Sequence, residues 1–338
     1  MKMKINLLVV TNLPSFYKLN LYNLIAEKKK IYVVFSGTGA DGRNDDFYKG
    51  NKNFKYCFLS GNVFEKTIML CKLILSYSYD ELLLGGWDSI MMMVAAMLSP
   101  KSKNSVVVES SIHESSVCGM KAFLKKIFIA KMSKIYVPGV SNGKLVQTLG
   151  FSGKLVYTKG VGVFNYIVQP KYKEILIVKK YLYVGRLVDV KNLKFLIEVF
   201  NELPHLDLTI VGFGEQEVEL QKMAMKNIHF LGAVNNVELP KVYQSHDVFI
   251  LPSKKEPWGL VVEEALNNGM PVIVSDMVGC YETIVNEDNG LVFKFDDKDS
   301  LMQAINRMSD VDYYNRLRKN ISKYDFAKIE KEQVSCYL

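Results

Sequence analysis

Short apolar runs alternate with amphipathic stretches along almost the whole chain, and this alternation limits the possible folds more than any other feature. The first runs, at 5–10 and 31–35, are typical of strands that are buried on both faces. The stretch between them, at 16–28, has the apolar spacing of a helix. Repeated strand–helix alternation predicts an α/β fold in which parallel sheets carry helices on both faces.

The alternation occurs in two series, and a stretch with proline and charged residues at 168–173 separates them. We therefore predict two Rossmann-like, doubly wound domains, at 1–168 and 169–318. Sheets of this type bind ligands at the carboxyl ends of their strands. The two domains are expected to face each other across a cleft formed by those ends.

Composition limits which cellular compartments and which classes of partner fit this chain. The five cysteines are scattered without metal-ligand or paired spacing, so we expect a cytoplasmic chain with neither a disulfide framework nor a metal site. The apolar run at 90–98 is far shorter than the roughly 20 residues of a membrane span. A net charge of +8 favours an anionic partner, either an acidic substrate, a phospholipid surface or nucleic acid. No nucleic-acid-binding motif is present, so nucleic acid is not expected.

The stretch 251–269 combines a strand end, a charged loop and a helix that ends at Gly269. Glu256 and Glu264 lie eight positions apart, a separation of about 12 Å if both are helical. Between them, Gly259 and the next two residues are expected to present free N–H groups at a helix N-terminus, where anions bind. This order predicts a site that binds a sugar, a diphosphate and a ribose in a row. In the alternative interpretation, at least one acid stabilises only the helix dipole.

Two cations follow the first strand of the second series. Arg186 comes directly after Gly185, and Lys191 follows five residues later. A guanidinium and an ammonium at a strand end suit a diphosphate, although two solvated loop cations would give the same pattern. Gly212 and Gly214 close the next strand and would let the backbone approach a ligand, but this signal is weak alone.

Together these motifs resemble the retaining family 4 glycosyltransferases. The resemblance rests on Arg186 with Lys191, the Gly212–Glu215 turn, the acids of 256–264, and the segments Phe230–Gly232, Leu251–Ser253 and Gly269–Val272. It covers most of 181–293 in the right order and implies the GT-B architecture. In that architecture chain ends cross back, which implies that 319–338 returns to the first domain.

The resemblance also implies roles. Glu256 corresponds to the acid that contacts the donor sugar, and Glu264 to the one that binds the ribose. Arg186 and Lys191 correspond to the diphosphate pair, which makes a metal or other cofactor unnecessary. The complete donor-binding set consists of Gly185, Arg186, Lys191, Gly212, Gly214, Val234, Pro257, Trp258, Gly259, Leu260, Val261 and Glu264.

The first half carries fewer signals. Pro14, Ser15 and Tyr17 follow its first strand, where they resemble a loop of cell-surface polysaccharide transferases; alternatively, Ser15 is only a helix N-cap. Glu109 and His113 follow another strand, and the resemblance assigns His113 to the reaction centre together with Glu256. A lone histidine can equally be structural.

The stretch 121–134 is basic and amphipathic. It predicts either a helix that packs on the core with one solvated face or a helix that docks on an anionic membrane surface. The second interpretation would place the protein peripherally on the inner face of the plasma membrane.

The sequence therefore predicts a retaining, metal-independent glycosyltransferase of surface polysaccharide biosynthesis. The donor would be a UDP- or GDP-sugar, and the acceptor a glycan or a polyprenyl-linked oligosaccharide. A nucleotide-sugar 2-epimerase of the same fold, and a non-catalytic nucleotide-binding protein, are the alternatives.

Overall fold

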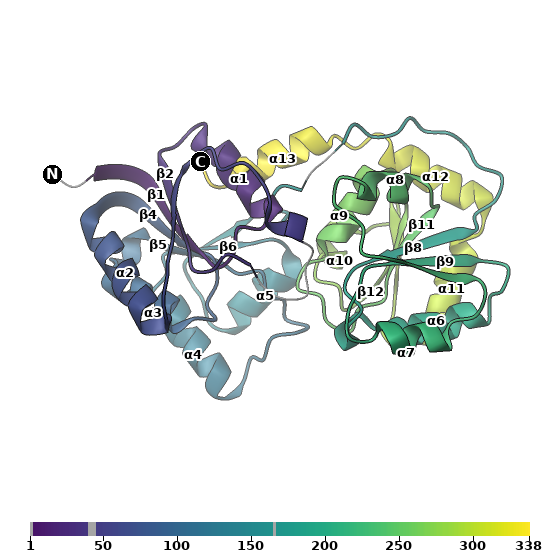
Figure 1. Cartoon of the computed structure of the whole chain (residues 1–338), viewed down its shortest axis with the longest axis horizontal. Coiled ribbons are helices and arrows are strands. Elements are labelled where there is room, and N and C mark those ends of the chain that lie inside the picture. The colour runs from purple at the N-terminus through teal and green to yellow at the C-terminus, as the bar shows by residue number, and fades with distance from the viewer. Residues whose placement is uncertain (1–2, 40–44, 165–166) are drawn as a thin grey trace. The chain divides into compact units, whose positions relative to one another are not determined.

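The computed structural model describes residues 3–39, 45–164 and 167–338 and divides the chain into two compact units. The first unit contains 3–39, 45–164 and 327–338, and the second contains 167–326. Each unit is built on one parallel sheet (Figure 1), so the predicted α/β class with two Rossmann-like domains is confirmed. The chain returns to the first unit at 327, later than the predicted 319.

Seven parallel strands form the first sheet, in the order β3-β2-β1-β4-β5-β6-β7. They are β1 (Met3–Thr11), β2 (Ile31–Phe35), β3 (Lys55–Phe58), β4 (Tyr77–Leu84), β5 (Asn104–Val107), β6 (Lys134–Val137) and β7 (Lys154–Tyr157). The helices are α1 (Phe16–Ala26), α2 (Val63–Ser76), α3 (Ile90–Leu98), α4 (Gly119–Ile129), α5 (Val140–Thr148) and α13 (Phe326–Ser335), with short 3₁₀ turns at Asp45–Tyr48 and Lys101–Lys103.

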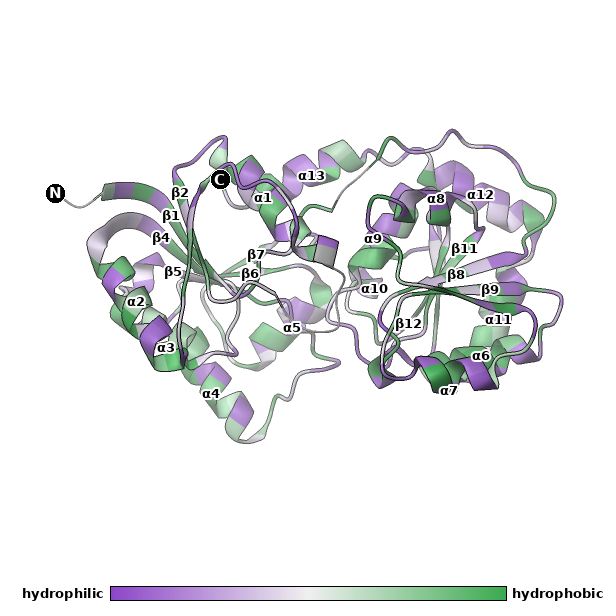
Figure 2. Ribbon diagram, viewed as in Figure 1, coloured by the Kyte–Doolittle hydropathy of each residue, from purple (hydrophilic) through white to green (hydrophobic). Residues whose placement is uncertain are grey.

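The continuous apolar run of β1 fills a core on each face of this sheet. Leu8 and Val10 join a cluster with residues of α2, α3, α4 and α5, whereas Leu7 and Val9 join a cluster with α1 and the segment of Val334. Successive strand residues point to opposite faces, so a strand that is buried twice reads as unbroken hydrophobicity. Figure 2 shows this hydrophobic character in the central strands.

Six parallel strands form the second sheet, in the order β10-β9-β8-β11-β12-β13. They are β8 (Lys180–Val184), β9 (Asp207–Val211), β10 (Ile228–Gly232), β11 (Val248–Leu251), β12 (Val272–Ser275) and β13 (Gly290–Phe293). The helices are α6 (Leu193–Asn201), α7 (Glu217–Met223), α8 (Leu239–Gln244), α9 (Leu260–Asn267), α10 (Tyr281–Ile284), α11 (Lys298–Met308) and α12 (Val311–Ile321), and a 3₁₀ turn spans Asp189–Lys191.

Side-chain caps fix where several helices begin. Asn62 accepts from the Glu65 N–H at 3.0 Å, and the Glu65 carboxylate accepts from the Asn62 N–H at 2.8 Å, which closes a capping box before α2. Asp310 caps α12 by accepting from the Tyr313 N–H at 3.0 Å. Helix α12 remains in the second unit with Leu317 and Ile321 buried, so residues 319–321 do not belong to the returning segment.

Candidate active site

Each sheet reverses its strand order once, between β1 and β4 in the first unit and between β8 and β11 in the second. Loops that leave the two strands at such a point run in opposite directions, and ligands of open α/β sheets bind beside them. In the second unit, the β8 loop carries Arg186 and Lys191, and the β11 loop carries Glu256. The predicted donor residues therefore converge at the position where this fold binds ligands.

Lys191 and Glu256 form an ion pair between Nζ and Oε2, and their side chains are only 13% and 14% exposed. Backbone contacts between the two loops hold this pair in place, since the Lys254 N–H donates to the Val190 carbonyl at 2.9 Å. Asn192, in the left-handed region with φ 58°, then turns the chain into α6. The sequence assigned the two charges to different parts of a donor, and the structure brings them into direct contact.

Arg186 differs from Lys191 because it is exposed and forms no ion pair within the described part of the chain. Its backbone is nevertheless fixed, since the buried Tyr183 hydroxyl donates to the Arg186 carbonyl at 2.9 Å. A guanidinium on an anchored backbone is well placed to form forked hydrogen bonds with an anion.

Gly212 and Gly214 allow one loop to pack against another. A Cβ on Gly212 would lie 1.8 Å from the Gly185 carbonyl oxygen, and one on Gly214 would lie 2.4 Å from the Leu187 carbonyl oxygen. The Leu187 N–H also donates to the Phe213 carbonyl at 2.9 Å. These two glycines therefore make room for the backbone of the β8 loop, whereas the sequence predicted that they make room for a ligand.

The backbone around Glu256 is held by the loop after β12. The Gly279 N–H donates to the Glu256 carbonyl at 2.8 Å, and the Cys280 N–H donates to the Trp258 carbonyl at 2.9 Å. A Cβ on Gly279 would lie 1.9 Å from the Pro257 carbonyl oxygen, so only glycine fits there without a shift. The segment 256–258 is therefore rigid before any ligand binds.

Helix α9 begins at the same place with unsatisfied donors. Gly259 has φ 101°, which an L side chain rarely adopts, and it turns the loop into the helix. Among the described residues, no acceptor is found for the N–H groups of Gly259, Leu260 and Val261. These groups, together with Arg186, give the site an excess of anion-binding donors.

Two adjacent acids on α9 have different environments. The Glu264 Oε2 accepts from the Tyr243 hydroxyl at 3.1 Å, and burial raises the pKa of Glu264 to about 7. The Glu263 Oε2 accepts from the Trp258 indole N–H at 2.7 Å, and burial raises the pKa of Glu263 to about 8. Trp258 is only 2% exposed, so its side chain packs beneath the loop with Glu263 and does not face a ligand.

Val234, another predicted donor residue, lies in the loop after β10 and is partly exposed. β10 is an edge strand separated from β8 by β9. Val234 therefore shares the carboxyl edge of the sheet with the other donor residues but follows a strand two places from the reversal.

In the first unit, Pro14 and Ser15 lie in the loop between β1 and α1, at the reversal of that sheet. Ser15 occupies the N-cap position of α1 but makes no capping hydrogen bond, and its Oγ is buried without a partner in the described part of the chain. Tyr17 packs edge-on against Phe47 with ring centres 5.9 Å apart. The simple N-cap interpretation of Ser15 is therefore wrong for its side chain.

Glu109 is joined to a residue that the sequence analysis did not single out. The Lys18 Nζ lies 3.2 Å from Glu109 Oε1, and the Lys18 side chain is 9% exposed. Burial acts to lower the pKa of Lys18, but the charges of Glu109, Tyr17 and Tyr22 together outweigh burial and raise it. The amide of Asn142 fixes the backbone after β5 by donating to the Glu109 carbonyl at 2.7 Å. His113 follows in a partly buried turn of the same loop.

Comparison with known proteins identifies the second unit. Residues 170–326 match the family model described as glycosyl transferases group 1. The second unit is therefore similar to the glycosyl transferases group 1 family along most of its length. An O-antigen biosynthesis glycosyltransferase of Escherichia coli is 33% identical over 51% of this chain and 48% of its own length.

A second Escherichia coli relative is a UDP-Gal:α-D-GlcNAc-diphosphoundecaprenol α-1,3-galactosyltransferase, 33% identical over 40% of this chain and 38% of its own. The chain thus spans about half or less of the length of these curated relatives. Among solved structures, Anabaena HepE in complex with UDP-glucose aligns with a TM-score of 0.71 and 14% identity, over 97% of this chain and 98% of its own. Both units therefore have the GT-B fold.

The sequence motifs do not include two residues that build the candidate active site. Gly279, four positions after β12, and Tyr243, at the end of α8, position Glu256 and Glu264 from outside the recognised motifs. Gly279 could have been noticed as a glycine shortly after a buried strand, whereas Tyr243 gives no sequence signal. Among the described residues, no three His, Cys, Asp or Glu side chains are placed to share a metal ion.

Proposed function

We propose that the protein is a retaining glycosyltransferase that moves a sugar from a nucleotide-diphosphate sugar to a hydroxyl of a glycan or lipid-linked glycan, without a metal. The observation that carries this proposal is the convergence of Arg186, the Lys191–Glu256 pair and the free N–H groups of α9 at the strand reversal of the second sheet.

The donor diphosphate would be bound by Arg186, Lys191 and the N–H groups at 259–261. Because the charge on the departing diphosphate grows as the glycosidic bond breaks, fixed cations and dipoles there stabilise the transition state. The ribose would be bound by Glu264, whose carboxylate Tyr243 orients. A UDP- or GDP-sugar fits this order of groups, and the UDP-glucose complex of HepE favours uridine.

Lys191 and Glu256 are paired without a ligand, which indicates how they would act together. On donor binding, Lys191 would turn to a phosphate oxygen and Glu256 to sugar hydroxyls. Glu256 orients the sugar and is not a nucleophile. The bond from the anomeric carbon to the phosphate oxygen breaks, the acceptor oxygen attacks from the same face, and the departing phosphate takes the acceptor's proton. His113 would contribute from the first unit, near the sugar.

The acceptor would be bound by the first unit. The Lys18–Glu109 pair, Pro14, Ser15 and Tyr17 lie at the carboxyl ends of its strands, where ligands of such sheets bind. The diphosphoundecaprenol acceptor in the name of one relative, and the O-antigen role of another, support a polyprenyl-linked glycan of surface polysaccharide biosynthesis.

We also propose that α4 docks on the inner face of the plasma membrane, where such an acceptor resides. Phe123 and Leu124 are 58% and 51% exposed, and the exposed Lys121 and Lys126 flank them. Other apolar residues of this helix, including Phe128, are buried in the core. Helix α4 therefore carries apolar side chains on its exposed face as well as on its buried face. Figure 2 shows hydrophobic and hydrophilic residues alternating along this helix. No described helix combines the length and apolarity needed to span a bilayer.

The membrane proposal predicts that Lys121→Glu with Lys126→Glu weakens co-sedimentation with vesicles of 30% anionic lipid by at least about tenfold, since each cation contributes about 1 kcal/mol. Lys154→Glu, on β7, is the matched charge control. Unchanged sedimentation of the double variant would contradict docking through α4.

Two experiments test the transfer reaction. Thermal-shift assays against UDP, GDP and their sugars should identify one stabilising nucleotide. Glu256→Ala should then reduce transfer at least about 100-fold while the affinity for the nucleoside diphosphate changes less than about threefold. Wild-type transfer by this variant would refute the role of Glu256. Turnover of the donor to an epimer without acceptor would instead identify a 2-epimerase.

A further inference from the structure

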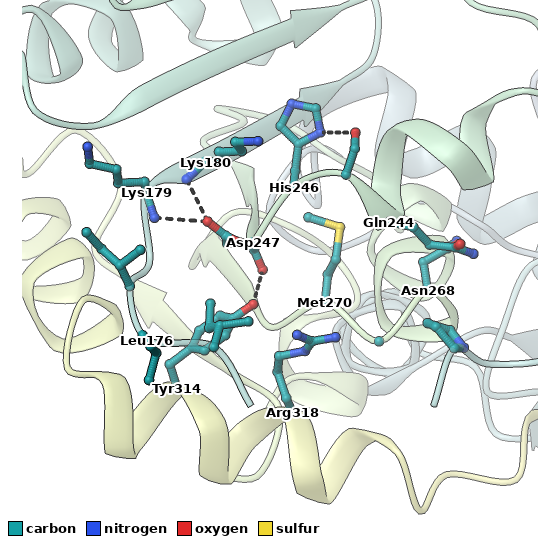
Figure 3. Close-up of a pocket in the computed structure, with 15 residues that line it drawn as sticks. Leu176, Lys179, Lys180, Gln244, His246, Asp247, Asn268, Met270, Tyr314 and Arg318 are labelled. Carbon is teal, nitrogen blue, oxygen red and sulfur yellow. Dashed lines mark hydrogen bonds between the residues drawn. The ribbon is translucent and has the colours of Figure 1, made fainter. Parts of the chain in front are cut away.

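A cavity of about 430 Å³ lies in the second unit, away from the candidate active site (Figure 3). Its lining includes Lys180 at the start of β8 and Asp247, which directly precedes β11. These are the amino ends of parallel strands whose carboxyl ends carry Arg186 and Glu256. The cavity and the candidate active site therefore occupy opposite edges of one sheet.

Positive charge is in excess around this cavity. Lys179, Lys180 and Arg318 line it, and none forms an ion pair within the described part of the chain. Among the described residues that line it, Asp247 alone is acidic, and its Oδ2 accepts from the backbone N–H groups of Lys179 and Lys180 at 2.9 and 2.8 Å. Burial lowers the pKa of His246, so this side chain adds no charge at neutral pH.

Arg318 is the most constrained of the three cations. It reaches the cavity from α12, partly buried, and its guanidinium lies 6.0 Å from the centre of the Tyr314 ring. The Tyr314 hydroxyl in turn donates to the Asp247 carbonyl at 2.9 Å. This guanidinium retains most of its five donors for a ligand, since its hydrogen bonds to the Lys173 carbonyl and to the Tyr314 hydroxyl use only part of them.

One wall of the cavity is apolar and faces solvent. Leu176 is 93% exposed and Ile177 is 60% exposed, and both line the cavity. The chain is fixed just before them, because the Asn315 amide donates to the Ile175 carbonyl at 3.0 Å and accepts from the Ile175 N–H at 3.2 Å. Exposed apolar side chains that follow this fixed residue, beside cations without an ion pair among the described residues, suit a ligand with both an anionic and an apolar part.

We propose that this cavity binds a small molecule that carries a phosphate group and a short apolar portion. Arg318 and Lys180 would bind the phosphate oxygens, and Leu176 and Ile177 would cover the apolar portion. Its volume lies within the range of about 300–1,000 Å³ that is typical of small-molecule sites. Three cations against one internally bonded carboxylate favour a phosphate, which carries up to two negative charges, over a monocarboxylate.

The two sites must be distinguished experimentally, because α9 contributes to both. Asn268, which lines the cavity, donates from its side chain to the Glu264 carbonyl at 2.9 Å. A phosphate probe could bind in the cavity or in the candidate active site, at opposite edges of the sheet. Each site is therefore tested with a separate variant.

The test uses phenyl phosphate as the probe in isothermal titration calorimetry on the full chain. The wild type should bind it, Lys180→Gln with Arg318→Gln should weaken binding at least tenfold, and Arg186→Gln with Lys191→Gln should leave a site of wild-type affinity. Inorganic phosphate should bind several-fold more weakly than phenyl phosphate. Lys180→Gln alone, at an exposed position, should weaken binding a few-fold and guards against misfolding of the double variant.

Absence of binding to the wild type would overturn the proposal. Equal affinity in the wild type and the Lys180/Arg318 variants would also overturn it, as would loss of binding in the Arg186/Lys191 variant alone. Equal affinity for phenyl phosphate and inorganic phosphate would overturn the role of Leu176 and Ile177.

Discussion

Each unit places a lysine–glutamate pair at the carboxyl ends of its strands, but the two pairs have different surroundings. In the first unit, the buried Lys18 contacts Glu109, and its Nζ also donates to the Asn12 side-chain oxygen Oδ1 at 3.5 Å. In the second unit, Lys191 meets Glu256 beside the unpaired Arg186 and the free N–H groups of α9. This difference indicates that an anion site is marked less by the lysine–glutamate pair than by nearby hydrogen-bond donors that have no acceptor among the described residues.

The largest expected effect concerns stability in the first unit. Glu109→Ala would leave the Lys18 ammonium buried without its partner, so we expect it to lower the free energy of unfolding of that unit by about 3 kcal/mol. Urea denaturation would measure this. The matched control is Glu332→Ala, which removes an exposed pair with Lys159 of the same 3.2 Å length and should cost less than about 1 kcal/mol. Equal losses in both variants would show that burial does not make the Lys18–Glu109 pair more important for stability than an exposed pair.

The corresponding change in the second unit should affect binding. Lys191→Met removes a charge-assisted contact worth about 2 kcal/mol, so the dissociation constant for the donor nucleoside diphosphate should rise about 30-fold in calorimetry. Lys194→Met, which breaks the exposed pair with Glu219, is the control and should change affinity less than twofold. An unchanged dissociation constant for Lys191→Met would make its pair as structural as that of Lys18.

Donor binding should also depend on pH through Glu264. Its pKa is raised to about 7 by burial, so the carboxylate that accepts from a ribose is only partly formed at pH 6. We expect the donor dissociation constant to fall several-fold between pH 6 and 8, and Glu264→Gln to abolish this dependence. A pH profile that is unaltered in Glu264→Gln would contradict the ribose role.

The raised pKa of Glu264 also makes the stability of the folded second unit depend on pH. The folded state keeps its proton on Glu264 between pH 4.5 and about 7, whereas the unfolded chain loses it at about pH 4.5. This group therefore stabilises the folded state below pH 4.5, and its contribution is lost as the pH rises to 7. Glu264→Gln should flatten that part of the stability profile of the second unit.

The smallest expected effect concerns Tyr243. Tyr243→Phe removes one hydroxyl that donates to Glu264 Oε2 at 3.1 Å, and the ring remains in the core. We expect a two- to fourfold rise in the donor dissociation constant, corresponding to about 0.5–1 kcal/mol. Phe249→Leu, on β11, whose ring centre lies 6.0 Å from that of Tyr243, serves as a control for general packing changes. A Tyr243→Phe variant with wild-type affinity would show that Glu264 needs no orienting partner.

Much of the fold could be predicted because its central strands are buried on both faces. The bounds of β2 agree with the predicted run 31–35. β3 and β7 were missed because they are edge strands with half-exposed residues, so neither forms a continuous apolar run. The predicted donor residues of the second unit, such as Arg186 and Glu256, belong to short motifs that can be read from the sequence, and their role in donor binding stays a prediction. The Lys18–Glu109 pair joins residues 91 positions apart, and no local pattern announces it.

The return of 327–338 to the first unit has a consequence for biosynthesis. Tyr337 stacks on Tyr136 with ring centres 4.6 Å apart, and Val334 belongs to the core cluster beneath α1. When the ribosome has made the first unit through 164, one face of its sheet still lacks this cover. The apolar side chains of that face therefore stay uncovered, and accessible to chaperones, until the whole second unit has been translated. The second unit, which is continuous in sequence, can fold as soon as it emerges.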